Sequence, residues 1–257
     1  MEIVRVRTER GASYGRVDRA SGTVHLLKGE TFVEIVRDLH EGVAAESGQL
    51  VLFEEELLLA PAEPGKIIVI GRNYGGRAEE AGRLVVHLKP PTAVIGPNDP
   101  VVLPRISRDT RFEGELAVVI GRVCRDIAPE QADGAVFGYT CANDVTAWDV
   151  GSDGGQWTTA KGFDSFCPLG PSITTDLDPL HAEITTRVNG EVRQSGSTAG
   201  LVRSVHQLVA GLSALMTLLP GDVLLTGTPE GSAALHDGDV VEVGIAGVGV
   251  LRNPVSG

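Results

Sequence analysis

The stretch FEGELAVVIG, residues 112 to 121, places two acids where an apolar strand begins. Glu113 and Glu115 flank a glycine, and the run from Leu116 to Ile120 that follows is apolar throughout. Side chains two residues apart on a strand point to the same face, so the two carboxylates should be neighbours. Two charged carboxylates ~4–5 Å apart repel each other by roughly 3–4 kcal/mol at an effective dielectric constant of about 20. Beside a buried strand the pair therefore needs a cation or a shared proton.

A third acid, Asp144, follows the apolar strand predicted over residues 136 to 140. Three carboxylates with water in the remaining positions suit a hard, octahedral ion such as Mg²⁺ or Mn²⁺. No histidine lies near these acids in the sequence, which argues against zinc. Gly114 fits the same picture, because a residue without a side chain allows a close approach to the backbone. The residues alone leave an alternative open, in which Glu113 and Glu115 lie on a solvated strand edge and Asp144 caps a turn.

Charge and hydropathy exclude some classes of function. The 257 residues carry a net charge of -12 and no basic cluster, which argues against a nucleic-acid partner. The opening residues MEIVRVRTERG are charged, and no apolar run approaches ~18 residues, so we expect neither a signal peptide nor a membrane partner. Lysine is scarce and occurs at four positions: Lys28, Lys66, Lys89 and Lys161.

The cysteines also indicate the compartment. Cys124, Cys141 and Cys167 are odd in number and far apart, and they form no Cys-x-x-Cys pair. This pattern favours reduced thiols in a cytoplasmic protein over a disulfide framework or a zinc site. Cys167 is interpreted as a small core residue rather than a nucleophile.

Periodicity predicts a strand-dominated α+β fold. Residues 1–62 form a small N-terminal module, with strands over 2–8 and 23–27 and a helix over 31–39, and residues 65–257 form the larger domain. The segment LLLAPAEPGK, with two prolines and a glycine, is the predicted junction. In the larger domain Asn189-Gly190 predicts a tight hairpin within 183–194, a second hairpin is predicted over 240–253, and Ser204 with Gln207 predicts a capped helix.

From about residue 65 onward the sequence resembles the fumarylacetoacetate hydrolase family. Seven stretches occur in the order of the family: GRNYGGRAEE (71–80), LKPPTAVIGPNDPVVLP (88–104), FEGELAVVIGR (112–122), GYTCANDVTAWD (138–149), QWTTAKGFDSFCPLGP (156–171), VNGEVRQSGST (188–198) and MTLLPGDVLLTGTPEG (216–231). The resemblance implies a mixed β-sandwich roll with a divalent metal at its mouth. It also implies a small 2-oxo, diketo or hydroxy-enol carboxylate as substrate, and isomerisation, C–C hydrolysis or decarboxylation as the reaction.

The resemblance assigns roles by position. It implies Glu113, Glu115 and Asp144 as ligands of Mg²⁺ or Mn²⁺, Lys161 and Glu80 as catalytic residues, and Arg72, Tyr74, Arg77 and Thr228 as substrate-binding residues. It further implies a homodimer. For three of these residues structural alternatives stay open: an ion pair of Arg72 with Glu79 or Glu80, an ion pair of Lys161 with Asp164, and a turn hydroxyl at Thr228.

Four positions depart from the family pattern. Arg77 stands where a histidine is expected, and arginine stays protonated and cannot act as a base. Trp148 and Gly151 replace an arginine and a glutamine that often contact substrate, and His87 replaces a usual phenylalanine. We therefore expect an isomerase as readily as a hydrolase or decarboxylase, and a metal-binding protein without turnover remains the alternative. The Gly-rich, charged segment from Asn73 to about Val86 is predicted to form a mobile lid.

Overall fold

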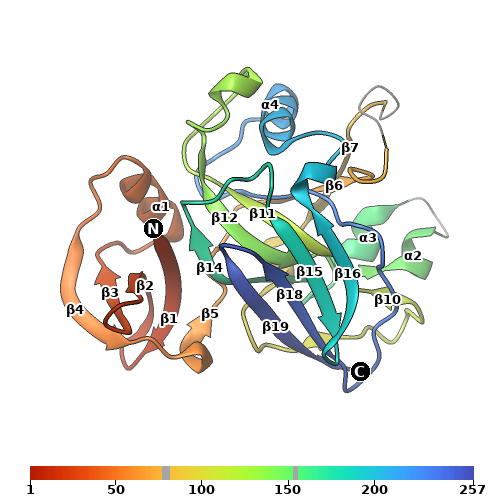
Figure 1. The fold of residues 1–257 in the computed structure, drawn as a ribbon, viewed down its shortest axis with the longest axis horizontal. Coiled ribbons are helices and arrows are strands. Elements are labelled where there is room, and N and C mark those ends of the chain that lie inside the picture. Colours follow the sequence, from red (N-terminus) through yellow and green to blue (C-terminus); the bar gives the residue numbers. More distant parts are fainter. Residues whose placement is uncertain (77–81, 153–155) are drawn as a thin grey trace.

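The computed structural model describes residues 1–76, 82–152 and 156–257, and strands dominate them, which confirms the predicted α+β class (Figure 1). The largest sheet is mixed, and the acids of the opening stretch begin one of its central strands. In pairing order the sheet runs β4 (Glu46–Leu52), β3 (Thr23–Leu27), β2 (Gly11–Asp18), β1 (Glu2–Thr8), β14 (Cys167–Thr174), β12 (Val136–Asn143), β11 (Gly114–Ile120), β17 (Val223–Leu225), β6 (Ile67–Gly71) and β7 (Val85–Lys89), while β5 (Leu58–Leu59) pairs with β1 and β8 (Val94–Ile95) pairs with β14.

A second sheet packs against the centre of the first. Its order is β16 (Glu191–Ser197), β15 (Glu183–Val188), β18 (Val240–Ile245), β19 (Gly249–Ser256) and β9 (Val101–Val102). Both predicted hairpins are present, and Asn189 and Gly190 have φ angles of 53° and 82°, as a tight hairpin turn with two left-handed residues requires. Ile184 and Val243 of this sheet pack with Leu116 and Cys141 of the first sheet in one buried core.

The helices are short and lie around the sheets. α1 (Phe32–His40) and α4 (Val205–Leu215) begin at capping boxes, made by Thr31 with Glu34 and by Ser204 with Gln207. Two further helices, α2 (Trp148–Ser152) and α3 (Trp157–Lys161), were not predicted, and they flank a small pair of strands, β10 (Thr110–Arg111) and β13 (Thr146–Ala147). The 3₁₀ turns are η1 (Glu55–Leu57), η2 (Pro91–Ala93), η3 (Pro129–Gln131) and η4 (Thr198–Gly200). Within the described ranges, none of the helices has the length and hydrophobicity needed to cross a bilayer.

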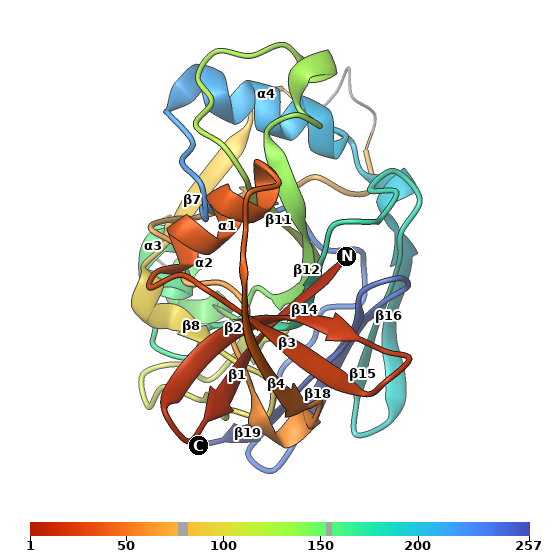
Figure 2. The same cartoon turned by 90° about the vertical axis from the view of Figure 1, so that its left-hand side faces the viewer.

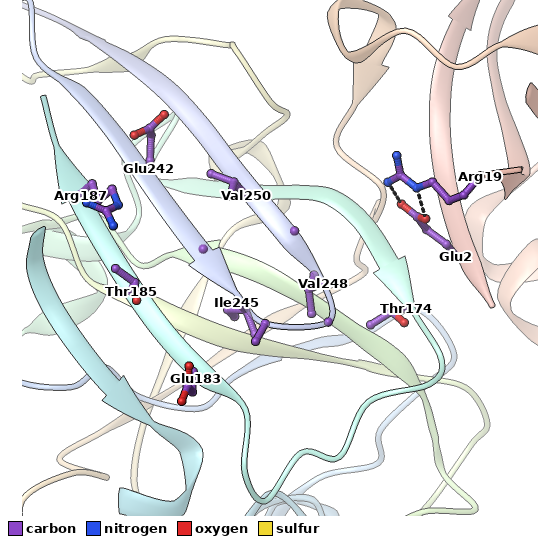
Figure 3. Close-up of a pocket in the computed structure, with 14 residues that line it drawn as sticks. Glu2, Arg19, Thr174, Glu183, Thr185, Arg187, Glu242, Ile245, Val248 and Val250 are labelled. Atoms are coloured by element: carbon purple, nitrogen blue, oxygen red, sulfur yellow. Dashed lines mark hydrogen bonds and ion pairs between the residues drawn. The ribbon is translucent and has the colours of Figure 1, made fainter. Parts of the chain in front are cut away.

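The N-terminal strands β1 to β4 lie to one side of the molecule, where Figure 2 shows them from the front. Glu2 and Ile3 of β1 pair with Thr174 and Ile173 of β14, so these strands extend the edge of the large sheet. Between this segment and the β18–β19 hairpin lies a groove of about 690 Å³ (Figure 3). The side chain of Arg19 donates a hydrogen bond of 2.8 Å to Glu2 at one wall of the groove. A division of the chain at residues 62 to 65 stays a prediction.

Candidate active site

The three predicted metal ligands converge because two central strands are antiparallel neighbours. Gly114 of β11 pairs with Asn143 of β12, so Glu113, just before β11, meets Asp144, just after β12. The backbone N–H of Asp144 donates to the carbonyl of Glu113 at 2.8 Å. One carboxylate oxygen from each of Glu113, Glu115 and Asp144 lies within 4.8 Å of the other two. The solvated-edge alternative is wrong, because Glu113 is only 8% exposed and Glu115 only 1%.

The close approach predicted at Gly114 is made by side chains of the second sheet. A Cβ atom at this position would lie 2.1 Å from Thr186 Oγ1, a distance that real Cβ atoms do not show. The N–H of Gly114 donates to Gln194 Oε1 at 3.0 Å, and Gln194 is itself buried. Glycine between the two acids therefore lets the second sheet pack directly behind them.

Burial raises the pKa of both glutamates. Desolvation is the largest influence on Glu113, whose pKa rises to about 7 although Lys161 partly opposes the change. The pKa of Glu115 rises well above its usual range because of burial and the charges of Asp144 and Glu113. Burial would also raise the pKa of Asp144, but Lys161 and Lys89 together outweigh burial and hold it below its ordinary value. The nearby lysines therefore do not fully compensate the negative charge of the two glutamates.

Lys161 reaches this cluster from the last residue of α3. Its Nζ lies 3.1 Å from Glu113 Oε2, donates to Thr146 Oγ1 at 2.8 Å and also contacts the Asp144 carboxylate. Lys161 thus pairs with Glu113 and Asp144, and not with Asp164 as the structural alternative supposed. Burial alone would lower the pKa of Lys161, but Asp144 and Glu113 raise it above its ordinary value. The ammonium group therefore stays charged beside the acids.

Lys89, at the end of β7, is a second buried cation that sequence reasoning did not assign to the site. Its Nζ donates to three backbone carbonyls, those of Val145, Lys161 and Phe166, at 2.9, 2.9 and 2.8 Å. It also lies 2.8 Å from Asp144 Oδ1 as an ion pair, although that oxygen has no hydrogen-bond partner among the described residues. The ammonium group thus donates to three carbonyls and also forms an ion pair with Asp144 on this side. The scarcity of lysine was the one signal for it in the sequence.

A pocket of about 530 Å³ opens in front of the acids and Lys161. Three of the predicted substrate-binding residues line it: Arg72, Tyr74 and Thr228. The fourth, Arg77, and the predicted catalytic residue Glu80 lie outside the described residues, as does Glu79, because residues 77–81 in the middle of the predicted lid are not described. The lid cannot extend to Val86 as a loop, because Val85–Lys89 forms strand β7.

Tyr74 lines this pocket, and its hydroxyl group is buried. Its oxygen has no hydrogen-bond partner among the described residues, and burial together with Glu115 raises the pKa of the phenol. Asn73 holds the segment in place through hydrogen bonds to the backbone of Thr226 and Arg203. Tyr74 therefore remains protonated, and no described residue accepts its hydroxyl proton.

Thr228 and Arg72 contribute to the pocket in different ways. The Thr228 hydroxyl donates to the carbonyl of Gly114 at 2.9 Å and accepts from Gln194 Nε2 at 2.8 Å. Its proton is therefore engaged, and it can offer a substrate only an acceptor. Arg72 is exposed and has a φ of 57°, a left-handed conformation that turns the chain at the end of β6.

Aromatic side chains form part of the pocket wall. His87, Trp148 and Trp157 line it, with Trp157 between the other two at ring-centre distances of 6.1 Å from His87 and 5.1 Å from Trp148. Gly151 has a packing role instead, because a Cβ atom there would lie 2.8 Å from the Trp157 ring. Of the departures at 148 and 151, only Trp148 changes the wall of the pocket.

Three buried carboxylates beside a charged lysine form a candidate metal site, and comparison with known proteins identifies the family of the chain. Residues 66–256 match the family described as Fumarylacetoacetate (FAA) hydrolase C-terminal, so the chain belongs to that family, as the sequence motifs predict. The human mitochondrial oxaloacetate tautomerase FAHD2A is 37% identical over 250 residues, which cover 91% of this chain and 79% of that protein.

Solved structures extend the similarity to the whole chain. The crystal structure of 2-hydroxyhepta-2,4-diene-1,7-dioate isomerase from Mycobacterium marinum superposes with a TM-score of 0.89 at 39% identity, covering 100% of this chain and 98% of the other. Maleylpyruvate hydrolase from Sphingobium sp. SYK-6, in complex with manganese(II) and pyruvate, has a TM-score of 0.81 at 32% identity, covering 100% and 99% of the two chains. Relatives with isomerase, tautomerase and hydrolase names thus share this fold.

Proposed function

We propose that this protein is a divalent-metal-dependent enzyme that interconverts isomers or tautomers of a small 2-oxo or 2-hydroxy-dienoic dicarboxylate. The observation that carries the proposal is the convergence of three buried carboxylates beside a charged lysine in an open pocket. Relatives named as a 2-hydroxyhepta-2,4-diene-1,7-dioate isomerase and an oxaloacetate tautomerase support this class of reaction.

The side chains of the cluster suit Mg²⁺ or Mn²⁺. Glu113, Glu115 and Asp144 offer oxygen donors only, and burial of the two glutamates makes a cation favourable. These three residues would hold the ion, and when bound it would polarise the 2-oxo group of a substrate. The manganese in the related maleylpyruvate hydrolase is consistent with this assignment.

Residues of the chain then bind and orient the substrate. Lys161 carries a positive charge at the base of the pocket, where it stabilises negative charge on a substrate oxygen. Tyr74 also lines the pocket, and Arg72 can hold a carboxylate in a forked geometry. The volume of about 530 Å³ suits a small molecule rather than a polymer.

Hydrolysis or decarboxylation is the second candidate reaction, supported by the related maleylpyruvate hydrolase. In that case Glu80 is the predicted base that activates water, directly or through an ordered water, since Arg77 cannot take the role. The third possibility is a silent family member that binds metal and ligand without turnover.

We expect the protein to act in the cytoplasm as a homodimer with no nucleic-acid or membrane partner.

A substrate panel distinguishes these functions. Purified protein with Mg²⁺ or Mn²⁺ is assayed against oxaloacetate, acylpyruvates and dienoic dicarboxylates, with Glu113→Ala as the control. An isomerase changes the enol or diene absorbance without releasing a fragment, whereas a hydrolase or decarboxylase releases pyruvate, a second acid or CO₂. Ligand binding without turnover across the panel would refute the proposal and favour the binding protein.

A further inference from the structure

The proposed isomerisation requires a group that carries a proton between a substrate oxygen and a substrate carbon. Several described groups of the pocket are unsuited to this. Lys161 is held in its charged form by Asp144 and Glu113, and burial keeps the phenol of Tyr74 protonated. The three clustered carboxylates are needed for the metal. Two proton-exchanging side chains of the described pocket remain, His87 and Glu230.

Strand β7 places His87 in the wall of the pocket. Alternate residues of a strand share a face, so His87 lies on the same face as Val85 and Lys89. Val85 also lines the pocket, and Lys89 reaches Asp144 at 2.8 Å. His87 is thus two residues before Lys89 on the same face of β7, and Lys89 contacts the metal-binding cluster at Asp144.

The imidazole ring of His87 is held in place on two sides. Trp157 packs against it with ring centres 6.1 Å apart. On the neighbouring strand β6, Gly71 lies beside the ring, since a Cβ atom at this glycine would be 3.5 Å from His87 Nε2, an ordinary contact distance. Glu230, by contrast, is exposed at the rim of the pocket. The ring is therefore positioned by the fold, while the carboxylate is not.

We propose that His87 is a catalytic residue that carries the proton during enol–keto interconversion, an inference that rests on the proposed isomerase or tautomerase function. In the enol-to-keto direction the imidazole accepts the enol O–H proton, the C=C electron pair forms a new C–H bond with that proton, and the C–O bond becomes C=O. The ring begins and ends neutral, and no oxidant, reductant or second substrate is consumed. The reverse reaction follows the same path.

The charges around the ring favour its neutral form. Burial is the largest influence, and with Lys161 of α3 it lowers the pKa of His87, while Asp144 beyond the end of β12 partly opposes the change. A neutral imidazole has one nitrogen that can accept a proton and one that donates. His87 can therefore accept a proton at neutral pH without prior deprotonation.

The test compares two substitutions at His87 with a remote histidine. His87→Gln keeps a polar side chain, and His87→Phe keeps an aromatic ring against Trp157. His181→Gln is the matched control, because His181 is 71% exposed and pairs only with Asp178 among the described residues. Glu230→Gln tests the rival carrier. For each variant kcat, KM and the pH profile are measured on the substrate of the wild-type enzyme, with metal affinity and thermal denaturation as checks on the fold.

Both His87 variants should lose about a hundredfold or more in kcat, the usual contribution of general acid–base catalysis, with KM changed by less than about threefold. In both variants the part of the pH profile of kcat that follows the titration of His87 should disappear. The control His181→Gln should behave as the wild type. If His87→Phe keeps its kcat within about threefold of the wild type, or if Glu230→Gln instead of the His87 variants loses kcat, the inference is overturned. Either result leaves the proposed function intact. Absence of wild-type turnover on the panel would overturn both.

Discussion

Replacing Lys89 by Met tests how the site is held together. The substitution leaves three buried carbonyls, those of Val145, Lys161 and Phe166, without their donor and removes the charge 2.8 Å from Asp144. Removing one partner of a buried ion pair costs about 3–5 kcal/mol, because the remaining charge stays buried without compensation. For a chain of this size that corresponds to a melting temperature lower by roughly 6–20 °C.

The assay is equilibrium unfolding in urea together with thermal denaturation followed by circular dichroism. Lys28→Met serves as the control, since Lys28 is exposed and its loss should change stability by less than about 0.5 kcal/mol. The Lys89→Met variant should also hold the metal less tightly, because the residue ties the backbone after Asp144 to the end of the Lys161 helix. If the melting temperature of Lys89→Met falls by less than about 2 °C, the claim that Lys89 compensates the buried charge of Asp144 is refuted.

Three further predictions follow from the same geometry. Metal-free protein should lose stability as pH rises from about 4.5 to about 7, because native Glu113 keeps a proton that the unfolded chain releases, and a melting curve with the same slope in Glu113→Gln would contradict this. Gly114→Ala should cost about 1–3 kcal/mol in chemical denaturation and weaken metal binding, because the new methyl group overlaps Thr186; wild-type values would speak against the packing role. The three cysteines are buried, and burial raises their thiol pKa values, so iodoacetamide should label them only in denatured protein, and rapid labelling of native protein counts against it.

Local signals in the sequence predicted the elements that depend on neighbouring residues. The capping box of Ser204 and Gln207 and the Asn189-Gly190 turn need only short-range chemistry, and both are present. The acids at 113 and 115 were also informative, because charge at the start of a buried strand needs compensation wherever the strand lies. The seven motifs in order predicted the family, which the family match confirms.

Contacts between distant parts of the chain could not be predicted in the same way. Gln194 accepts a hydrogen bond from Gly114, 80 positions away in the sequence. Lys89 donates hydrogen bonds to three backbone carbonyls that are 56 or more positions away. Helices α2 and α3 have five residues each, too few for a hydrophobic period to appear. Gly151 was interpreted as a position facing substrate, but its role in packing against Trp157 becomes visible only once these helices are placed.

The most direct test of the central claim is titration calorimetry of Mg²⁺ and Mn²⁺ into chelator-treated protein. The convergence of Glu113, Glu115 and Asp144 predicts one divalent ion per chain, with binding abolished in Glu115→Ala and retained in Lys28→Met. Absence of binding heat with both metals, or undiminished binding in Glu115→Ala, would contradict the account.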